Sequence, residues 1–522
     1  MAGPSADPSP ARPSSERPSS ERLERNALRH LLWDAAFATA VGSLNSGVVL
    51  VAYALYFGAS NQVIGVLAAI PLLTQLLQAP AVILVERVRR RRMISITALF
   101  IARLALPLMA VLSLIPNTAV ALALLVLAET VHCAFNAVAA CSWNSWIRDL
   151  VPEARLGRFF ARRTVWATAI GLVGSLAAAY ALDRVGDGGP SPAFMALYGA
   201  GFLAGLASTW HLSRVPEPPM PPVEQKLNIR RLMRAPLRDR NFRRVIVFLA
   251  SWQFAVNAAV PFFTVYFVQR LGIAMGFVMI LSVVSQIANM IVLRTWGHIS
   301  DRFSNKTALG LAAPLFLGCI ASMVVASQIG SQTLRLAFLV ALHAVMGAAS
   351  AGVGVASGAL TLKLAPKGAA TAYGAASALL SAAAAGIAPI IGGMFADFFA
   401  ARRLGLQVTW EDPSGLHELL TFRLSHWDFY FLISAALGLY ALHRLSLVNE
   451  HGEVSRSQVV EELGQRVREG VQNASPVAGL RALVAFPGGA LIQFNQRRQA
   501  FRKAWSDAVH ANVVWRQGSP DE

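Results

Sequence analysis

The chain has 522 residues, of which 55% are apolar and only 14% are charged. Soluble domains usually carry about 25% charged residues, so this composition argues against an array of soluble domains. The net charge of +18 could suggest a nucleic-acid partner, but the distribution of the basic residues along the chain gives another explanation and we expect no such partner.

Residues 1–30 are predicted to be a disordered N-terminal tail. The opening stretch MAGPSADPSPARPSSERPSSER is rich in Pro and Ser and repeats the sequence RPSSE, a composition that cannot bury a core. The first hydrophobic run after the tail is long enough to remain in the protein as a helix.

Apolar runs of the length needed to cross about 30 Å of hydrocarbon recur through most of the chain. The strands of a membrane β-barrel would alternate apolar and polar residues over about ten positions, and we identify no such stretch. The sequence therefore predicts an all-α polytopic membrane protein. Its twelve predicted spans are residues 31–57, 61–85, 93–115, 118–142, 164–182, 193–213, 244–267, 274–295, 308–328, 334–362, 371–400 and 428–447.

The basic residues gather on one side of these spans. Of the 46 Lys and Arg residues, 39 fall in the N-terminal tail, the loops after even-numbered spans, the C-terminal tail or the span ends that border them. Basic residues mark the cytoplasmic side of membrane proteins, so we predict a multi-pass protein of a bacterial inner membrane with both termini in the cytoplasm. Binding to anionic lipid is a secondary use of this charge.

Residues 214–243 form the longest polar stretch between spans and separate two groups of six, residues 31–213 and 244–447. Its Arg-rich part is predicted to form a short helix on the membrane surface. The segment 448–522 is predicted to be a cytoplasmic tail with amphipathic helices.

Two pairs of loops indicate that the halves are copies of each other. GHISDRFSNK carries Asp301-Arg302 followed by Lys306, and VERVRRRR carries Glu86-Arg87 followed by Arg91 at the same spacing. Pro152 and Pro366, in the loops after the fourth and tenth spans, are separated by almost the same offset, which differs by a single position. The nearly constant offset favours parallel six-helix repeats.

At these residues the sequence resembles the major facilitator superfamily of secondary transporters. GHISDRFSNK satisfies the family's loop signature G-x-x-x-D-R-x-x-x-R/K, whereas the first copy has Val82 and Glu86 in place of the Gly and the Asp. The resemblance implies two pseudo-symmetric six-helix bundles around a central cavity. It also implies a cytoplasmic gate, formed by Gly297, Asp301, Arg302, Lys306, Glu86, Arg87 and Arg91.

The residue types of this loop fit such a gate. Gly297 would let two helices approach closely, and Asp301 would face the positive N-terminus of the span that begins near Thr371. The alternative is a stop signal that fixes topology by charge alone.

Ionisable side chains inside a membrane are costly and are therefore candidates for function. Glu129, His132 and Asn136 lie three and four residues apart, on one face of the fourth span. Arg103 of the third span lies at a similar depth as Glu129, and we predict a midplane ion pair between them. This pair either fixes the packing of two helices or tunes a proton-binding Glu129.

The resemblance implies that spans 1, 4, 7 and 10 line the cavity. Asn45, Gln253, Asn257 and His343 are then further candidates for contact with a solute or a proton. The alternative role for each is a hydrogen bond between helices.

The motifs of ATP hydrolysis and of the common hydrolases are absent, namely G-x-x-x-x-G-K-[ST], H-E-x-x-H and G-x-S-x-G, so we expect neither an enzyme nor a cofactor. The function we predict is secondary active transport of a small solute by alternating access, coupled to protons, by a monomer in the lipid bilayer. The alternative is a non-transporting sensor or assembly scaffold that acts through the C-terminal tail.

Overall fold

The computed structural model describes residues 16–151, 153–183, 191–220, 229–366, 369–412 and 415–450. Within them, twelve helices are long and apolar enough to cross a membrane. Each coincides with a predicted span, with ends that differ by at most eight residues. The twelve-span fold predicted from hydropathy is confirmed. The predicted amphipathic helices beyond Glu450 and residues 1–15 of the predicted tail lie outside the described residues.

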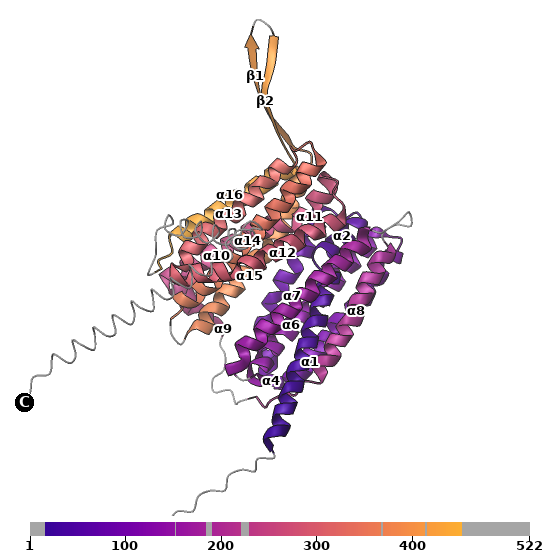
Figure 1. Cartoon of the computed structure of the whole chain (residues 1–522), viewed down its shortest axis with the longest axis vertical. Coiled ribbons are helices and arrows are strands. Elements are labelled where there is room, and N and C mark those ends of the chain that lie inside the picture. The colour runs from indigo at the N-terminus through magenta and orange to yellow at the C-terminus, as the bar shows by residue number, and fades with distance from the viewer. Residues whose placement is uncertain are drawn as a thin grey trace, which may run out of the picture. The chain divides into compact units, whose positions relative to one another are not determined.

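The first six spans are drawn in indigo to magenta in Figure 1. Two of them are interrupted: Gly47, with a positive φ of 59°, separates α1 from α2, and a short 3₁₀ turn separates α3 from α4. The elements are α1 (Glu16–Asn45), α2 (Val48–Tyr56), α3 (Asn61–Leu73), η1 (Thr74–Leu77), α4 (Gln78–Val88), α5 (Arg91–Val111), η2 (Leu112–Leu114), α6 (Thr118–Leu150), α7 (Glu153–Asp183) and α8 (Ser191–Ser213).

The second half begins with the short helix predicted for the Arg-rich segment, and its seventh span is broken beside Pro261 by a 3₁₀ turn and a π turn. Its elements are α9 (Ile229–Arg238), α10 (Arg240–Ala259), η3 (Val260–Phe262), α11 (Phe263–Val265), η4 (Tyr266–Arg270), α12 (Met275–Arg302), α13 (Asn305–Ala326), α14 (Gln332–Leu364), α15 (Ala370–Phe399), β1 (Arg403–Asp412), β2 (Gly415–Ser425) and α16 (Trp427–Ser446).

The structure differs from the prediction at the start of the chain. Residues 16–30, predicted as part of a disordered tail, form the first turns of α1. The segment ERLERNALRH is rich in Glu, Leu, Arg and Ala, which are strong helix formers, and it continues directly into the apolar part of α1. The Pro- and Ser-rich composition that predicts a tail extends to Ser20, five residues into α1, and the helix formers that follow it outweigh it.

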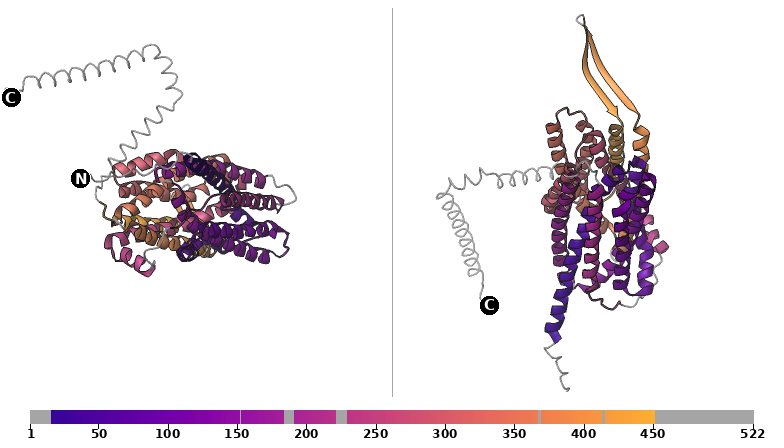
Figure 2. Two further views of the ribbon diagram at one scale, coloured as in Figure 1. Left: turned by 90° about the horizontal axis from the view of Figure 1, so that it is seen from below. Right: turned by 90° about the vertical axis from the view of Figure 1, so that its right-hand side faces the viewer.

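Two strands form an antiparallel hairpin between α15 and α16, with Arg403 opposite Ser425 and Asp412 opposite Gly415. The statement that no stretch alternates over ten residues is therefore wrong for β1. Leu404, Leu406, Val408 and Trp410 recur at every second position, the period of a strand, and the sequence DPSG that follows has the composition of a turn. Figure 2 shows the hairpin leading from the end of α15 into α16.

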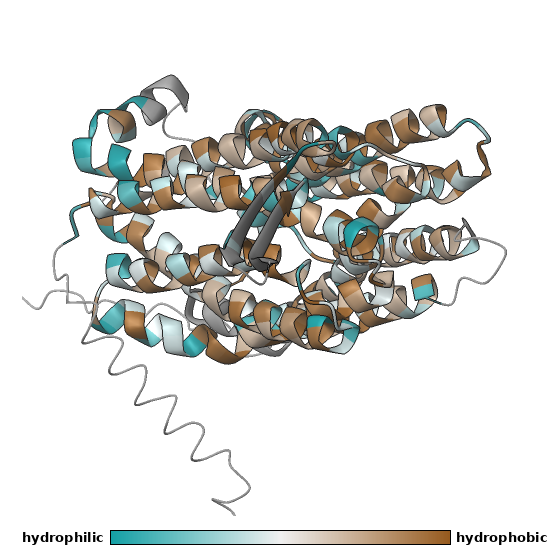
Figure 3. Ribbon diagram, turned by 90° about the horizontal axis from the view of Figure 1, so that it is seen from above, coloured by the Kyte–Doolittle hydropathy of each residue, from teal (hydrophilic) through white to brown (hydrophobic). Residues whose placement is uncertain are grey.

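We term the helix ends that carry Arg91 and Lys306 the basic end, and the ends joined by β1 and β2 the hairpin end. Many large apolar side chains point outward from the helices, among them Ile291, Leu203 and Leu439, which are 61% to 73% exposed. Figure 3 shows that hydrophobic residues predominate along the helices. Such a surface is suited to contact with lipid.

The two groups of six helices meet mainly through α3 and α15, and through α7 and α12. Glycines allow the first contact. A Cβ on Gly65 would lie 2.2 Å from the Pro389 carbonyl oxygen, and one on Gly393 would lie 2.4 Å from the Asn61 carbonyl oxygen. Residues 61–73 of α3 belong to the hairpin half of the second span, so the main contact between the bundles lies toward the hairpin end.

Candidate functional site

A cavity of about 520 Å³ lies among α1, α3, α5, α6, α7 and α8, on the N-terminal side of the molecule. It extends from Ser46 and Pro71 to Asn144 and Arg163. Its lining combines apolar side chains with charged ones from four different helices. The charged residues are Asp34, Arg103, Glu129 and Arg163. A pocket of this size with a few polar groups is the usual form of a site for a small molecule.

The three predicted polar residues of α6 all lie on the wall of this cavity. Glu129 and His132 are both buried. The His132 ring nitrogen Nδ1 is 2.9 Å from the carbonyl oxygen of Ala102 on α5, and Asn136 donates to the His132 carbonyl oxygen over 2.9 Å. The spacing of three and four residues therefore brings these groups to one place, as expected for one face of a helix.

The predicted ion pair between Arg103 and Glu129 is not among the ion pairs of the described residues. Glu129 Oε1 instead accepts a hydrogen bond of 3.1 Å from Cys133 Sγ, one turn along α6. The Arg103 side chain runs toward α8, where a Cβ on Gly205 would lie 2.4 Å from Arg103 Cδ. Because Gly205 has no side chain, it leaves Arg103 a path away from α6.

Asp34 of α1 is the acidic group whose charge acts on Arg103. It is buried and accepts a hydrogen bond of 2.7 Å from Ser208 of α8. Arg163 of α7 also acts on Asp34. The nitrogen Nε of Arg103 is buried without a hydrogen-bond partner in the structure. The cavity therefore holds an acid, Asp34, on which the charges of two cations act, and a second acid, Glu129, that has no ion pair among the described residues.

The other cavity candidates do not line this cavity. Asn45 is buried at the contact of α1 with α8, where its Nδ2 donates to the Leu197 carbonyl oxygen at 3.4 Å. Asn257 donates to the carbonyl oxygen of Gln253, one turn earlier in α10. His343 is buried, with Nδ1 2.8 Å from the Leu339 carbonyl oxygen of its own helix. In this conformation Asn45 bonds between helices, the alternative role expected for it, whereas Asn257 and His343 bond to the backbone of their own helices.

The gate residues of the second half are spread over the junction of α12 and α13. Asp301 and Arg302 are exposed at the end of α12. A Cβ on Gly297 would meet no atom within 4 Å, so the close helix approach predicted for it is wrong in this conformation. α12 does approach α14 closely at a glycine of α14, since a Cβ on Gly352 would lie 2.6 Å from the Trp296 ring.

Arg91, predicted as a gate residue of the first half, is fully buried within the N-terminal bundle. Its guanidinium pairs with Asp149 at the end of α6 and donates to the Pro218 carbonyl oxygen at 3.0 Å. Its backbone N–H donates to Glu217 Oε1 at 2.6 Å. Arg91 therefore ties α5 to α6 and to the segment that follows α8. Glu86 is half-buried and Arg87 is exposed at the end of α4.

A matching acid that sequence reasoning missed lies in the second half. Glu450 follows α16 and accepts hydrogen bonds from the backbone N–H groups of Asn305 (3.3 Å) and Lys306 (2.7 Å), at the start of α13. It also pairs with Lys363 Nζ at 2.8 Å. Burial alone would raise the pKa of Glu450, but the hydrogen bonds from Lys363, Lys306 and Asn305 outweigh it and hold this pKa below its usual value.

A repeat in the sequence could have revealed both acids. LSRVPE (212–217) and LSLVNE (445–450) share the pattern L-S-x-V-x-E, and each follows the last span of its bundle. In each, the Val is buried and the Glu accepts from the first N–H groups of a helix, α5 or α13. A carboxylate is stabilised at a helix N-terminus, which explains why an acid stands at the last position of both copies.

Two acids at the hairpin end join one bundle to the other. Asp397 of α15 accepts hydrogen bonds from Asn61 Nδ2 at 2.8 Å and from the Gln62 N–H at 3.1 Å. Asp183, the last residue of α7, accepts from the N–H of Gly276 at 2.8 Å, at the start of α12. Together with the glycine contacts of α3 and α15, these bonds hold the bundles against each other at the hairpin end.

Comparisons with known proteins agree with this architecture. The family model of the Major Facilitator Superfamily matches residues 32–389, which is more than half of the chain. No curated protein sequence matches the chain.

Solved structures of similar fold include three transport proteins. A point mutant of the nucleoside transporter NupG is 13% identical, with a TM-score of 0.60 over 81% of this chain and 100% of its own. A D-xylose–proton symporter is 18% identical, with a TM-score of 0.58 over 84% of this chain and 100% of its own. A bacterial homologue of the iron transporter ferroportin, in an inward-facing state, is 12% identical, with a TM-score of 0.58 over 82% and 98%.

At these identities the structural likeness concerns the fold, whereas the family model matches the sequence itself. The matched residues include the N-terminal bundle from residue 32 onward, the cavity of Glu129 and the loop signature of residues 297–306. The chain belongs to the Major Facilitator Superfamily.

Proposed function

We propose that the chain is a secondary active transporter that moves a small polar solute across a bacterial inner membrane, in exchange for or together with protons. The observation that carries this proposal is the cavity of about 520 Å³, in which buried charged side chains of both signs converge from several helices. Buried charges are costly in a membrane, and a site for a polar or charged solute gives them a use. The proteins of similar fold include a nucleoside transporter and a D-xylose–proton symporter, whose solutes are polar.

Glu129 is the residue that we propose to bind the coupling proton. Its carboxyl group is 3% exposed and accepts its hydrogen bond from a thiol rather than from a cation. An ionised carboxylate in such surroundings lacks the partner that would offset its desolvation. Uptake of a proton neutralises the group, so protonation and solute binding can influence each other through the shared cavity.

Alternating access would use the contacts at the two ends of the bundles. We infer that the described conformation is closed at the hairpin end, where Asp397 and Asp183 bond across the boundary between the bundles. With the basic end in the cytoplasm, as the distribution of Lys and Arg predicts, this is an inward-facing state. Transport then requires these bonds to break while the gate residues of α4, α12 and α13 come together.

The alternative of a sensor or scaffold depends on the C-terminal tail. Apart from residues 448–450, that segment lies outside the described residues, and no observation on the bundles favours this role. Transport is therefore the function that the site supports best.

The test uses proteoliposomes that contain a pH-sensitive dye and the full chain. A panel of sugars, amino acids, carboxylates and nucleosides is added outside, and the internal pH is followed. A coupled transporter changes the internal pH with at least one solute, and Glu129→Gln abolishes the pH change. Asn45→Asp, at a buried position outside the cavity, tests whether any change of buried charge has this effect. If Glu129→Gln leaves solute-driven proton movement unchanged, the assignment of Glu129 is wrong.

A further inference from the structure

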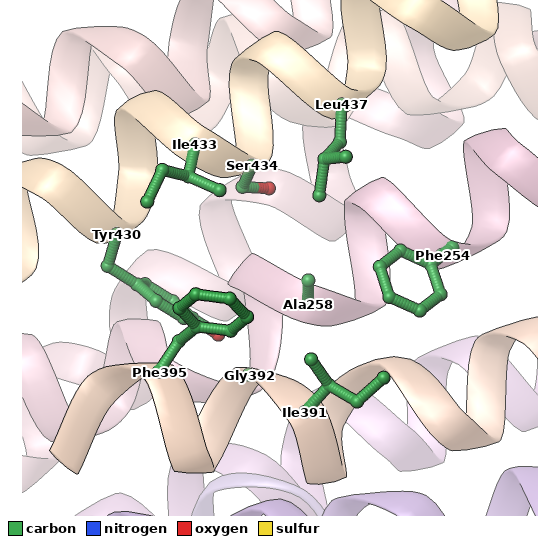
Figure 4. A pocket seen from close by; sticks show the side chains of 9 residues that line it. All are labelled: Phe254, Ala258, Ile391, Gly392, Phe395, Tyr430, Ile433, Ser434 and Leu437. Carbon is green, nitrogen blue, oxygen red and sulfur yellow. The ribbon is translucent and has the colours of Figure 1, made fainter. Parts of the chain in front are cut away.

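A second cavity, of about 280 Å³, lies among α10, α15 and α16. Figure 4 shows its lining, in which Phe254 of α10, Ile391 and Phe395 of α15, and Ile433 and Leu437 of α16 surround an apolar space. None of its lining residues is charged, and none is shared with the cavity of Glu129. This second cavity is therefore unsuited to the charged or highly polar solutes that the first one would accept.

The cavity opens toward the outer face of the C-terminal bundle. Phe395 and Leu437 at its rim are both exposed, as are the neighbouring Met394 and Leu439. The helices α15 and α16 each pack closely on α10 but touch each other much less. They form the two walls of a crevice whose floor is α10, and in a bilayer the open side of this crevice faces lipid.

Tyr430 gives the crevice its one unsatisfied polar group. The side chain is 3% exposed, and its hydroxyl has no hydrogen-bond partner in the structure. By contrast, the hydroxyl of Ser434 on the same helix donates to the Ala255 carbonyl oxygen at 2.7 Å. Gly392 makes room for the Tyr430 hydroxyl, because a Cβ there would lie 2.5 Å from that oxygen. Buried hydroxyl groups normally have a partner, so one is missing here.

The position of Tyr430 along α16 indicates how a ligand would be oriented. It is the fourth residue of a helix that begins at Trp427, so it lies about 5 Å from the helix start at 1.5 Å per residue. Leu437 lies about 15 Å from the start, near the middle of the hydrocarbon. The crevice is thus polar near the membrane interface at the hairpin end and apolar toward the midplane.

We propose that this crevice binds one acyl chain of a membrane phospholipid, with the ester carbonyl of that chain accepting a hydrogen bond from the Tyr430 hydroxyl. An acyl ester has an acceptor at one end and a hydrocarbon tail at the other, which matches the polarity of the crevice. The volume suits one chain segment, since a dry apolar cavity of roughly 150 Å³ is enough to hold benzene. A bilayer also supplies this ligand at high concentration.

The test places the full chain in lipid nanodiscs with phosphatidylcholine that carries a diazirine halfway along one ester-linked chain. After irradiation, labelled residues are identified by mass spectrometry. We expect residues 391–395 and 430–437 to be labelled more strongly than the exposed Leu439. Leu437→Trp fills the crevice and should reduce its labelling about fivefold, whereas the matched variant Leu439→Trp, two residues along the same helix, should not. Equal labelling of the crevice and Leu439, or equal effects of the two variants, would overturn the proposal.

Tyr430→Phe tests the hydrogen bond separately. The hydroxyl has no protein partner, so its removal should leave the fold intact. We expect labelling by the ester probe to fall about fivefold, the effect of losing one ordinary hydrogen bond. An ether-linked probe with the same diazirine lacks the carbonyl and should label both proteins equally. If Tyr430→Phe leaves ester labelling unchanged, or lowers both probes alike, the assigned hydrogen bond is wrong. Transport plays no part in this readout, so the result is independent of the proposed function.

Discussion

Asn61, at the start of α3, donates a hydrogen bond of 2.8 Å to Asp397, near the end of α15, across the boundary between the two bundles. The N–H of Gln62 donates to the second oxygen of the same carboxylate. Asn61 and Asp397 are 336 positions apart, and each lies beside a glycine contact of the same helix pair. The bond therefore stabilises the closed hairpin end specifically, and its loss should change the balance between conformations more than the stability of either bundle.

Asp397→Ala should lower the population of the state that is closed at the hairpin end. Two hydrogen bonds to an exposed carboxylate contribute about 1–2 kcal/mol together, which corresponds to a change of roughly 5- to 30-fold in the ratio of the two states. The measurement is the distance distribution between spin labels on Arg87 and His298, both exposed at the basic end of different bundles. We expect a shorter distance to gain population.

Gln332→Ala is the control for this measurement, because Gln332 is also exposed at the hairpin end but lies at the start of α14. Its distance distribution should match that of the unchanged protein. A distribution unaffected by Asp397→Ala would mean that the bond with Asn61 does not contribute to closure.

Arg103 should be energetically coupled to Asp34 and not to Glu129. We expect a double-mutant cycle of Arg103→Met and Asp34→Asn to give an interaction of about 1–3 kcal/mol, the range for residues in one polar network. The cycle of Arg103→Met with Glu129→Gln should give less than about 0.5 kcal/mol, the usual limit for independent sites. The free energy of unfolding in mixed detergent micelles, titrated with a denaturing detergent, measures both. The sequence-based prediction of an Arg103–Glu129 pair requires the larger interaction energy in the cycle with Glu129→Gln.

Glu450 should contribute to stability at neutral pH and lose this contribution in acid. Its pKa is lower in the folded protein than the ordinary 4.5, so its contribution is present in full above pH 4.5 and is lost as the pH falls through the lower folded value. Glu450→Gln should therefore lower the free energy of unfolding by about 2 kcal/mol at pH 7, a typical value for hydrogen bonds to a charged group. The deficit should shrink below pH 4.5.

Asp301→Asn is the matched control, since Asp301 is an exposed carboxylate at the same end of the C-terminal bundle. Asp301→Asn should leave the free energy of unfolding at pH 7 unchanged. The dependence of that free energy on pH should also stay the same as in the unchanged protein. A constant difference between the unchanged protein and Glu450→Gln from pH 7 to pH 3 would show that the charge of Glu450 is not the source of its effect.

Two glycines of α14 should respond in opposite directions to the same substitution. A Cβ on Gly352 would lie 2.6 Å from the Trp296 ring and 2.7 Å from Ala312 Cβ, so Gly352→Ala should destabilise by about 1–3 kcal/mol through overpacking. A Cβ on Gly354 meets no atom within 4 Å. Gly354→Ala should therefore stabilise by up to about 1 kcal/mol, because alanine favours the helix. Thermal unfolding of the two variants in detergent compares them directly, and equal shifts would contradict the packing of α12 on α14.

The spans and the polar face of α6 could be predicted from the sequence because both depend on local patterns. Hydropathy over about 20 residues defines a span, and the spacing of Glu129, His132 and Asn136 defines a helix face. Neither pattern contains the rotation of one helix against the next. The direction of Arg103 depends on the missing side chain of Gly205 on α8, three spans further along the chain, so its partner could not be derived from depth alone.

Two features that differ from the predictions could have been derived from the sequence. The alternation of Leu404, Leu406, Val408 and Trp410 before DPSG is a hairpin signal, although a search for apolar runs of span length does not detect it. The pattern L-S-x-V-x-E at 212–217 and 445–450 likewise marks Glu217 and Glu450. The close approach predicted for Gly297 is absent from this conformation, because a glycine allows close approach only where a neighbouring helix is present, and here Gly352 has that neighbour.

The junctions that contain Glu217 and Glu450 differ in the sign of one charge. In the first bundle a buried cation, Arg91, meets the acid Asp149 at the end of α6. In the second, the position related to Asp149 by the offset between Pro152 and Pro366 is the cation Lys363, and it meets the buried acid Glu450. The charge therefore changes sign at this one position, from Asp149 to Lys363, while each junction stays paired. If the end of α14 replaced the end of α6, Lys363 would lie beside Arg91. In the reverse replacement, Asp149 would lie beside Glu450. A viable chimaera of the two halves must therefore carry all the charged members of a junction together.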